Sequence, residues 1–300
     1  MQMTRWAEGF IAVDWGTPNR RAYRIGADRR CEREFEDGRG ILSVGRGEFE
    51  GAVAEIREKL GDAPMVLGGM IGSNRGWIEA PYVPCPAGLD ELTAGLVRIG
   101  EDIVIVPGVS LSGERFDVMR GEEIQLLGAI ASNEIPEDCL VCHPGTHNKW
   151  ARVGSGRIES FRTVMTGELF NMLRERSILS EILVEPAVPG ESFADGVRRG
   201  ISGSAITSEL FEARARFLLG DLAANDGASY VSGLLIGEDV QIGLSEGQGL
   251  PVIVMGRPEL TGLYSAALSE GGVRAEEVDG EGAFIAGACS RILIVASIPV

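Results

Sequence analysis

The segment FIAVDWGTPNRRAY, from Phe10 to Tyr23, ends an apolar run on a carboxylate and turns directly after it. Asp14 can hold a hydrated Mg²⁺ ion or act as a base. Gly16 allows the backbone to approach a phosphate, and Thr17 and Asn19 supply hydrogen-bond donors. An aspartate at a strand end is also a common turn former, so this turn alone leaves both interpretations open.

A second turn with similar groups occurs in HPGTHNKW. Gly145 permits close approach of a phosphate, and Thr146 and the neighbouring amides are donors. His147 and Lys149 lie on or beside this turn, where they could bind phosphate or serve only as ordinary structural groups. One such turn in each half of the chain would suit a nucleoside triphosphate held from both sides.

Further candidates for chemistry stand in MRGEEIQLLGA. Glu122 and Glu123 begin an expected helix, where the backbone dipole alone favours carboxylates. They also precede the second turn, so either one could orient or deprotonate an accepting hydroxyl, with Glu122 preferred over Glu123. Arg120 could neutralise a phosphate or a substrate carboxylate.

The loop GSNRGWIEAPY is polar and rich in hydrogen-bonding groups. An acceptor with hydroxyls and a carboxylate would need such a loop, and the preferred contacts are Ser73, Asn74 and Trp77. A surface loop with a packing tryptophan is the alternative.

Alternating apolar runs and turns predict the elements that position these residues. In the first half, strands are expected over 9–16, 20–26, 31–38, 64–70 and 102–108, and helices over 48–60 and 120–132. In the second half, strands are expected over 138–145, 149–154, 158–164, 251–256 and 273–280, and helices over 167–179, 206–222, 228–240, 259–272 and 281–295. Both halves open with three strands, which predicts an α/β protein of two similar domains, 1–136 and 137–300, with an active-site cleft between them.

Composition narrows the function further. The net charge is −16, which disfavours nucleic acid and anionic membranes as partners. Five cysteines in 300 residues predict reduced thiols, and no apolar run or leader predicts a membrane span or export, so a cytoplasmic location is expected. Cys139, Cys142, His143 and His147 crowd together, but Cys139 and Cys142 are expected on opposite faces of a strand, which argues against zinc.

Combined motifs give a resemblance. VDWGT, GGMIGSNRGWIEAPYVPCPAG, VMRGEEIQLLGA, PGTHNKW and FRTVMTGEL resemble, in this order, the 2-dehydro-3-deoxygalactonokinase family of the sugar kinase, Hsp70 and actin superfamily. The resemblance implies two RNase H-like domains and Mg²⁺- and ATP-dependent phosphorylation of 2-dehydro-3-deoxy-D-galactonate at its 6-hydroxyl, in galactonate breakdown. It also implies an adenosine site near Gly256, and a nucleotide-side position for Thr166, which is expected to cap a helix. Pro18 departs from the family pattern, in which a serine or threonine is usual.

Two other functions fit the same residues. A phosphatase or polyphosphate hydrolase of this fold would release phosphate without an acceptor, and a sugar or nucleotide sensor would bind without turnover. The choice between galactonate and gluconate stereochemistry and the oligomeric state, a homodimer included, stay open at this point.

Overall fold

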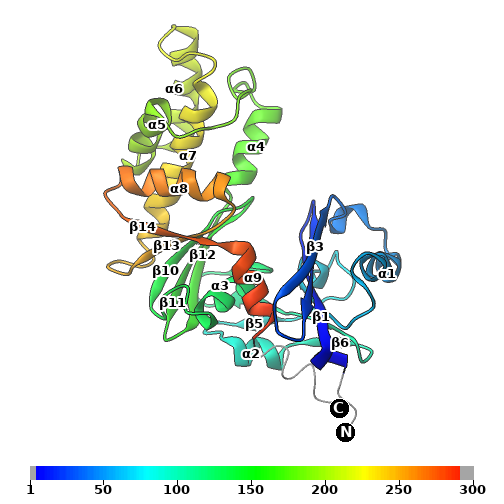
Figure 1. Ribbon diagram of the computed structural model, residues 1–300. Coiled ribbons are helices and arrows are strands. Elements are labelled where there is room, and N and C mark those ends of the chain that lie inside the picture. Colours follow the sequence, from blue (N-terminus) through cyan, green and yellow to red (C-terminus); the bar gives the residue numbers. More distant parts are fainter. Residues whose placement is uncertain (1–4, 291–300) are drawn as a thin grey trace. The chain divides into compact units, whose positions relative to one another are not determined.

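A computed structural model describes residues 5–290, and the chain divides into two compact units (Figure 1). Unit 1 comprises the chain up to Glu137, Gly154–Ser160 and the segment from Gly280 onward, whereas unit 2 comprises Asp138–Val153 and Phe161–Asp279. The chain first passes from unit 1 to unit 2 between Glu137 and Asp138, next to the expected boundary at 136/137. The segment after Gly280 differs from the expected division, because it is grouped with unit 1.

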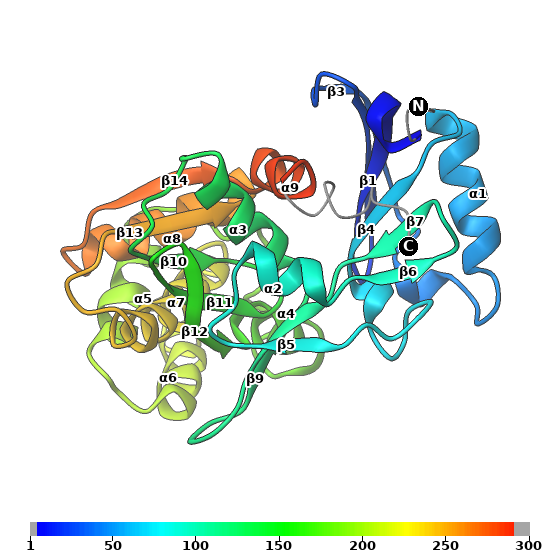
Figure 2. The same cartoon turned by 90° about the horizontal axis from the view of Figure 1, so that it is seen from below.

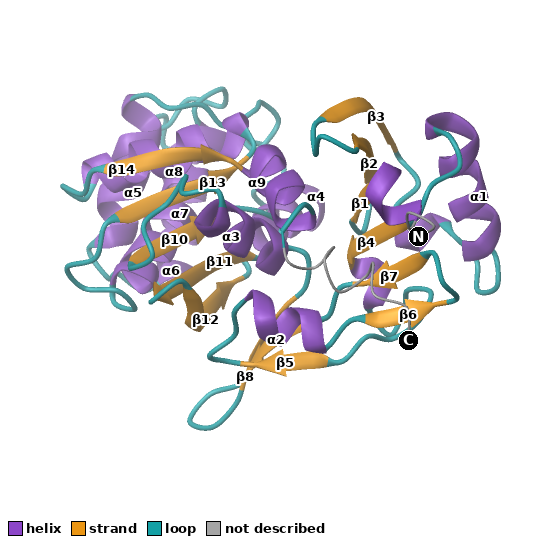
Figure 3. Ribbon diagram, turned by 60° about the horizontal axis from the view of Figure 1, so that its bottom comes forward, coloured by secondary structure: helices purple, strands orange, loops and turns teal. Residues whose placement is uncertain are grey.

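Unit 1 contains a six-stranded sheet in the order β3-β2-β1-β4-β7-β6 (Figures 2 and 3). The strands are β1 (Gly9–Trp15), β2 (Arg20–Gly26), β3 (Cys31–Asp37), β4 (Met65–Gly69), β6 (Val97–Ile99) and β7 (Ile103–Ile105). β1 pairs antiparallel with β2 and parallel with β4, and these registers set Asp14 between Arg21 and Gly68.

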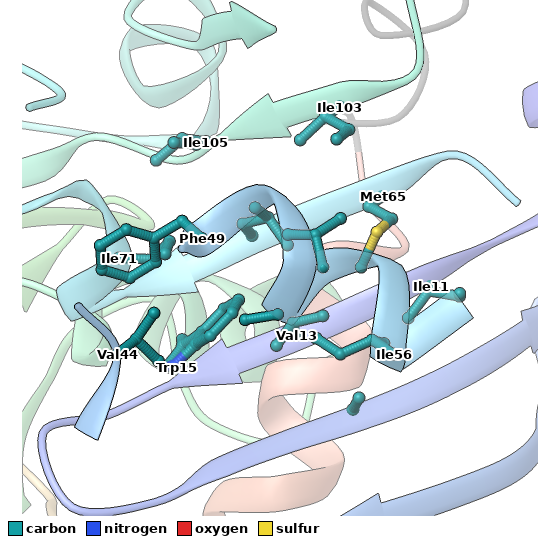
Figure 4. Packing of buried hydrophobic residues seen from close by; sticks show 14 of the residues in the cluster. Ile11, Val13, Trp15, Val44, Phe49, Ile56, Met65, Ile71, Ile103 and Ile105 are labelled. Carbon is teal, nitrogen blue, oxygen red and sulfur yellow. The ribbon is translucent and has the colours of Figure 1, made fainter. Parts of the chain in front are cut away.

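One face of this sheet packs on α1 (Phe49–Leu60). Ile11, Val13 and Trp15 alternate along β1 and therefore share that face, where they join α1 residues such as Phe49 and Ile56 in one buried cluster (Figure 4). Because successive side chains of a strand point to opposite faces, Asp14 points away from this core.

The last helix of unit 1, α9 (Gly280–Ala288), packs on α3 (Glu122–Ala131). A Cβ on Gly128 would lie 2.0 Å from the Ala283 oxygen, and one on Gly287 would lie 2.2 Å from the Ile124 oxygen. Only glycines permit so close a backbone approach, which explains why this helix joins unit 1 and not the C-terminal domain expected from chain order. The last residues of the expected helix, 291–295, lie outside the described residues.

The chain between β4 and β7, for which no helix or strand is expected, contains β5, α2 and β6. β5 joins a second sheet of order β5-β8-β9, whose other two strands follow β7 in the chain. The bounds are β5 (Tyr82–Pro84), α2 (Leu89–Ala94), β8 (Gly108–Leu111) and β9 (Asp117–Met119), and short 3-10 helices cover Arg5–Glu8, Ile41–Ser43 and Met70–Gly72.

Unit 2 repeats the first five strand positions of unit 1. Its sheet has the order β12-β11-β10-β13-β14, in which β10 pairs antiparallel with β11 and parallel with β13, and β13 pairs parallel with β14. The bounds are β10 (Cys139–His143), β11 (Asn148–Gly154), β12 (Arg157–Val164), β13 (Val252–Gly256) and β14 (Ala275–Asp279). The expected duplication of an RNase H-like unit is confirmed by this shared order, and so is the α/β class.

Helices gather beside the unit 2 sheet (Figure 1). They are α4 (Thr166–Arg176), α5 (Glu191–Ile201), α6 (Ile206–Leu218), α7 (Gly227–Leu244) and α8 (Pro258–Glu270). α5 is absent from the expected elements. Two glycines of α5, Gly196 and Gly200, pack against the backbone of α7. A Cβ on Gly196 would lie 2.1 Å from the Tyr230 oxygen, and one on Gly200 would lie 2.2 Å from the Leu234 oxygen.

Within residues 5–290, none of the helices combines the length and apolar character that a bilayer crossing requires.

Candidate active site

Asp14 stands near the carboxyl end of β1. Gly69, the last residue of the neighbouring strand β4, has φ 84°. A Cβ on Gly69 would lie 2.8 Å from the Trp15 oxygen and 3.3 Å from Oδ1 of Asp14. Part of the Asp14 surface remains accessible, yet burial raises its pKa to about 6. Arg21 opposes this rise through its positive charge, and Glu122 adds to it. A carboxyl of this kind is a suitable base near neutral pH.

The first turn forms its own hydrogen bonds. The Gly16 amide donates to the Asn19 carbonyl at 2.9 Å, and the Asn19 side-chain amide donates to Glu36 at 3.2 Å. Thr17 is exposed. Of the three residues expected to contact phosphate here, Gly16 and Asn19 therefore hold the turn together, and Thr17 presents its hydroxyl outward.

The start of α3 lies beside Asp14. Gly121 has φ 114°, and a Cβ on it would lie 3.4 Å from the Gly69 Cα atom. Glu123 is fully buried; its Oε2 accepts the Gly121 N–H at 2.7 Å, and its Oε1 has no hydrogen-bond partner among the described residues. Burial, with a contribution from the charge of Glu122, raises the Glu123 pKa to about 8.

Glu122 differs from Glu123 because it is only partly buried, and its Oε2 accepts the Arg120 N–H at 3.1 Å. At neutral pH, Glu123 is mainly a neutral acid, so Glu122 is the glutamate of this pair that can serve as a base. The preference for Glu122 that the sequence suggested thus has a physical reason in burial.

Arg120 lies beneath the loop that contains the expected sugar-acid contacts. Its guanidinium is buried, donates to the Ala80 carbonyl at 2.8 Å and lies 4.3 Å from the Tyr82 ring centroid. A Cβ on Gly72 would lie 2.9 Å from Nη1 of Arg120. These contacts join both ends of the loop, so Arg120 supports it, while the buried Nε and Nη1 atoms of Arg120 have no hydrogen-bond partner among the described residues.

The loop residues themselves have different surroundings. Ser73 is buried and its hydroxyl accepts the Arg75 N–H at 3.3 Å, whereas Asn74 is exposed. Trp77 is half-buried and packs on the core of unit 1. Asn74 therefore presents the most accessible polar group among the three expected contacts.

The second turn, 144–147, connects β10 to β11 in unit 2. It packs on the start of α4: the Glu168 amide donates to the Thr146 carbonyl at 2.9 Å, and His147 pairs with the Glu168 carboxylate. Thr146 and His147 are exposed, and Lys149 is buried on β11. Gly256 ends the parallel strand β13, where a Cβ would lie 3.7 Å from the Pro144 oxygen, so both strand ends meet here.

A cavity of about 250 Å³ opens beside this turn. Gly145 belongs to its wall, and the remaining lining comes from α4, α7, α8 and the segment before α5: Thr166, Gly167, Phe170, Ala187, Ser232, Leu235, Ile236, Glu259, Leu260, Leu263 and Tyr264. The mainly apolar wall suits a flat base, and a few polar groups could orient it.

Sequence reasoning missed most of this wall, because α7 and α8 residues read as ordinary helix positions. Thr166 had been expected as a helix cap, but Met165 occupies the N-cap position and makes no side-chain capping bond, while Thr166 is the first residue of α4. The glycine at 167 was the available signal: a Cβ there would lie 2.5 Å from the Gly145 oxygen.

Residues 5–290 contain no group of three or more His, Cys, Asp or Glu side chains arranged to hold an ion. Cys139 and Cys142 are buried on β10, and burial raises the pKa of both thiols, which disfavours the thiolates that zinc needs. Asp14 could hold Mg²⁺, because this ion is commonly held by one or two carboxylates together with phosphate oxygens and water.

Comparison with known proteins gives a family. Residues 14–291 match the family described as 2-keto-3-deoxy-galactonokinase. The 2-dehydro-3-deoxygalactonokinase of Escherichia coli (strain K12) is 36% identical over 285 residues, covering 93% of this chain and 95% of the relative.

Solved structures agree with this match. A Sinorhizobium meliloti protein that bears the same kinase name has a TM-score of 0.86 and 34% identity, covering 94% of this chain and 98% of its own. Component A of (R)-2-hydroxyglutaryl-CoA dehydratase from Acidaminococcus fermentans has a TM-score of 0.53 at 13% identity, covering 96% and 99%. The latter likeness concerns the fold alone.

Proposed function

The chain belongs to the 2-keto-3-deoxy-galactonokinase family, and we propose that it transfers the γ-phosphoryl group of ATP to the 6-hydroxyl of 2-dehydro-3-deoxy-D-galactonate. The observation that carries the proposal, beyond family membership, is Asp14 at the carboxyl end of β1, with its pKa raised to about 6 and the start of α3 beside it. A carboxyl that titrates near neutral pH suits acceptance of a hydroxyl proton during transfer.

In this proposal unit 1 holds the sugar acid. Asn74 contacts it from the loop, Ser73 and Trp77 fix the loop, and Arg120 supports the loop from below through the Ala80 carbonyl. Either Asp14 or Glu122 takes the proton of the 6-hydroxyl as its oxygen bonds to the γ-phosphorus and the bond to the leaving ADP oxygen breaks. Glu123, buried and mainly neutral, holds the Gly121 turn.

Unit 2 holds ATP in this proposal. The adenosine occupies the cavity of about 250 Å³, and the phosphates lie at Gly145, Thr146 and His147. The start of α4 is packed on this turn, and the partial positive charge of a helix N-terminus favours phosphate. Lys149 and Gly256 are neighbours of this site.

Asp14 would hold Mg²⁺ in concert with phosphate oxygens, and the ion would neutralise charge on the phosphates. A bound cation would lower the raised Asp14 pKa, so in the metal-bound form Glu122 would be the group that accepts the hydroxyl proton.

The setting is proposed on the same basis. With a net charge of −16, the protein is expected to act on small molecules without nucleic acid or membrane partners. Its five cysteines form no disulfide bond, in keeping with a cytoplasmic location. We also propose that the protein forms a homodimer, and light scattering would measure its mass in solution.

The test is ADP formation from Mg·ATP with 2-dehydro-3-deoxy-D-galactonate, with its gluconate epimer, and without acceptor. ADP formed only with the galactonate compound would support the kinase and its stereochemical choice. Phosphate release without acceptor would favour a hydrolase, and ADP binding without turnover would favour a sensor. Either of those results would contradict the proposed function.

A further inference from the structure

A fully buried carboxylate, Asp239 of α7, lies behind the ATP site proposed for unit 2. It accepts hydrogen bonds from four side chains. The Trp150 indole N–H donates at 2.7 Å, and the Asn148 amide contacts both carboxylate oxygens at 2.9 and 3.0 Å. The hydroxyls of Thr166 and Tyr264 complete the set.

These donors come from the elements that build the site. Asn148 is the first residue after the turn 144–147 and begins β11. Thr166 begins α4, and Tyr264 lies on α8; both of these side chains line the cavity. Asp239 itself lies outside the cavity wall, so it connects the turn and two walls from behind.

The cluster has little freedom to rearrange. Trp150 packs on α7, where a Cβ on Gly243 would lie 1.9 Å from its ring. The titratable groups that face Asp239 are Cys142 and Tyr264, and Glu238 adjoins it on α7. Burial raises the Asp239 pKa, and the four donors oppose that rise because they stabilise the charged form. Loss of the acceptor would leave several buried donors unpaired, which a fold tolerates poorly.

We propose that Asp239 is a positioning residue that fixes the phosphate turn 144–147 to the walls of the adenosine cavity, so that base and phosphates meet one rigid surface. This inference rests on the proposed function, which assigns ATP to unit 2. Asp239 does not touch ATP; it acts through Asn148, Thr166 and Tyr264.

The experiment compares Asp239→Asn with Glu238→Gln, which removes a neighbouring carboxylate of the same helix without touching the cluster. Each protein is checked by near-UV circular dichroism. The KM for ATP, the KM for the sugar acid, and the Kd for ADP by calorimetry are then measured.

Asp239→Asn turns one acceptor oxygen into a donor, and we expect its ADP Kd and ATP KM to rise at least about tenfold, the usual effect of losing one charge-assisted bond. The sugar-acid KM should stay within about twofold, and Glu238→Gln should match the wild type.

An ATP KM of Asp239→Asn within about twofold of the wild type, or an equal rise in both KM values, would overturn the inference, because a merely structural defect would not select one substrate. If Asp239→Asn does not fold, Asn148→Leu decides the matter by the same measurements, since it breaks the link between the turn and Asp239 and leaves the other three donors in place. It also removes the 3.6 Å contact between the Cys142 thiol and the Asn148 amide oxygen, which lies away from the cavity wall. Wild-type protein that binds ADP but shows no turnover would contradict the proposed function and leave the comparison of ADP affinities intact.

Discussion

Replacement of Asp14 by Asn should stabilise the protein while abolishing its activity. Burial raises the Asp14 pKa from 3.8 to about 6, so the folded chain binds a proton at this carboxyl more tightly than the unfolded chain does. The resulting stability is complete below pH 4 and is lost as the pH rises through 6. With about 1.4 kcal/mol per pKa unit, the ionised carboxyl costs about 3 kcal/mol of unfolding free energy at pH 8 and about half of that at pH 5.

Asn has nearly the same shape and does not ionise, so the variant avoids this cost. Urea unfolding of wild type and Asp14→Asn at pH 5 and pH 8, with EDTA and without nucleotide, measures the difference. Asp37→Asn is the matched control with the opposite sign. Burial raises the pKa of Asp37, but hydrogen bonds from Arg20, the Arg39 amide and Lys59 outweigh it and lower the pKa, so its loss should destabilise the fold at pH 8.

The kinase rate of Asp14→Asn should fall at least about 100-fold, the lower range for loss of a catalytic base. Wild-type activity in the variant would refute the assigned role. Equal stability of wild type and variant at pH 8 would refute the electrostatic reasoning, even if activity were lost.

Three further predictions concern other residues. Glu122→Gln should lower kcat at least about 100-fold, whereas Glu123→Gln, which replaces a mainly neutral acid, should stay within about tenfold at pH 7; the reverse order in steady-state assays would exchange their roles. Gly167→Ala places a Cβ 2.5 Å from the phosphate turn, so the ATP KM should rise while the sugar-acid KM does not, and an unchanged ATP KM would move the phosphates elsewhere. Gly196→Ala should cost about 1–3 kcal/mol in urea unfolding through overpacking, whereas Gly190→Ala, with open space around its Cβ, should cost much less; equal effects would contradict the close packing of α5 on α7.

The sequence predicts most individual strands and helices of the fold. The apolar run of FIAVDW predicts β1, and the repeat of three strands predicts the shared order of the two sheets. α5 was not accessible, because Gly196 and Gly200 lower helix propensity, and only their packing on α7 reverses that cost. Short strands such as β5 and β9 carry too few residues for a periodic pattern.

The sequence predicts only part of the candidate site, because burial and contacts between distant residues depend on tertiary packing. Asp14 lies near the end of a strand, Glu122 begins a helix and Gly145 lies in a turn, and at such places residue type reflects chemistry. Glu122 and Glu123 are adjacent and identical in type, and only the folded structure shows that Glu123 is fully buried and that burial raises its pKa. Asp239 is 91 residues from Asn148 in the chain, so no spacing rule connects them.

The way the chain completes unit 1 has a consequence for its synthesis. α3 ends at Ala131, but the helix that packs on its glycine face begins only at Gly280. Unit 2 lies almost entirely between these points. The ribosome therefore synthesises every residue of unit 2 before α9 is available to pack on α3. Until then, the surface of α3 around Gly128 lacks the helix that packs on it in the folded protein. Fragments that end near Glu137 should thus be poorer folding units than the boundary in the chain suggests, and a chaperone that engages nascent chains would find its substrate in the first half of this protein.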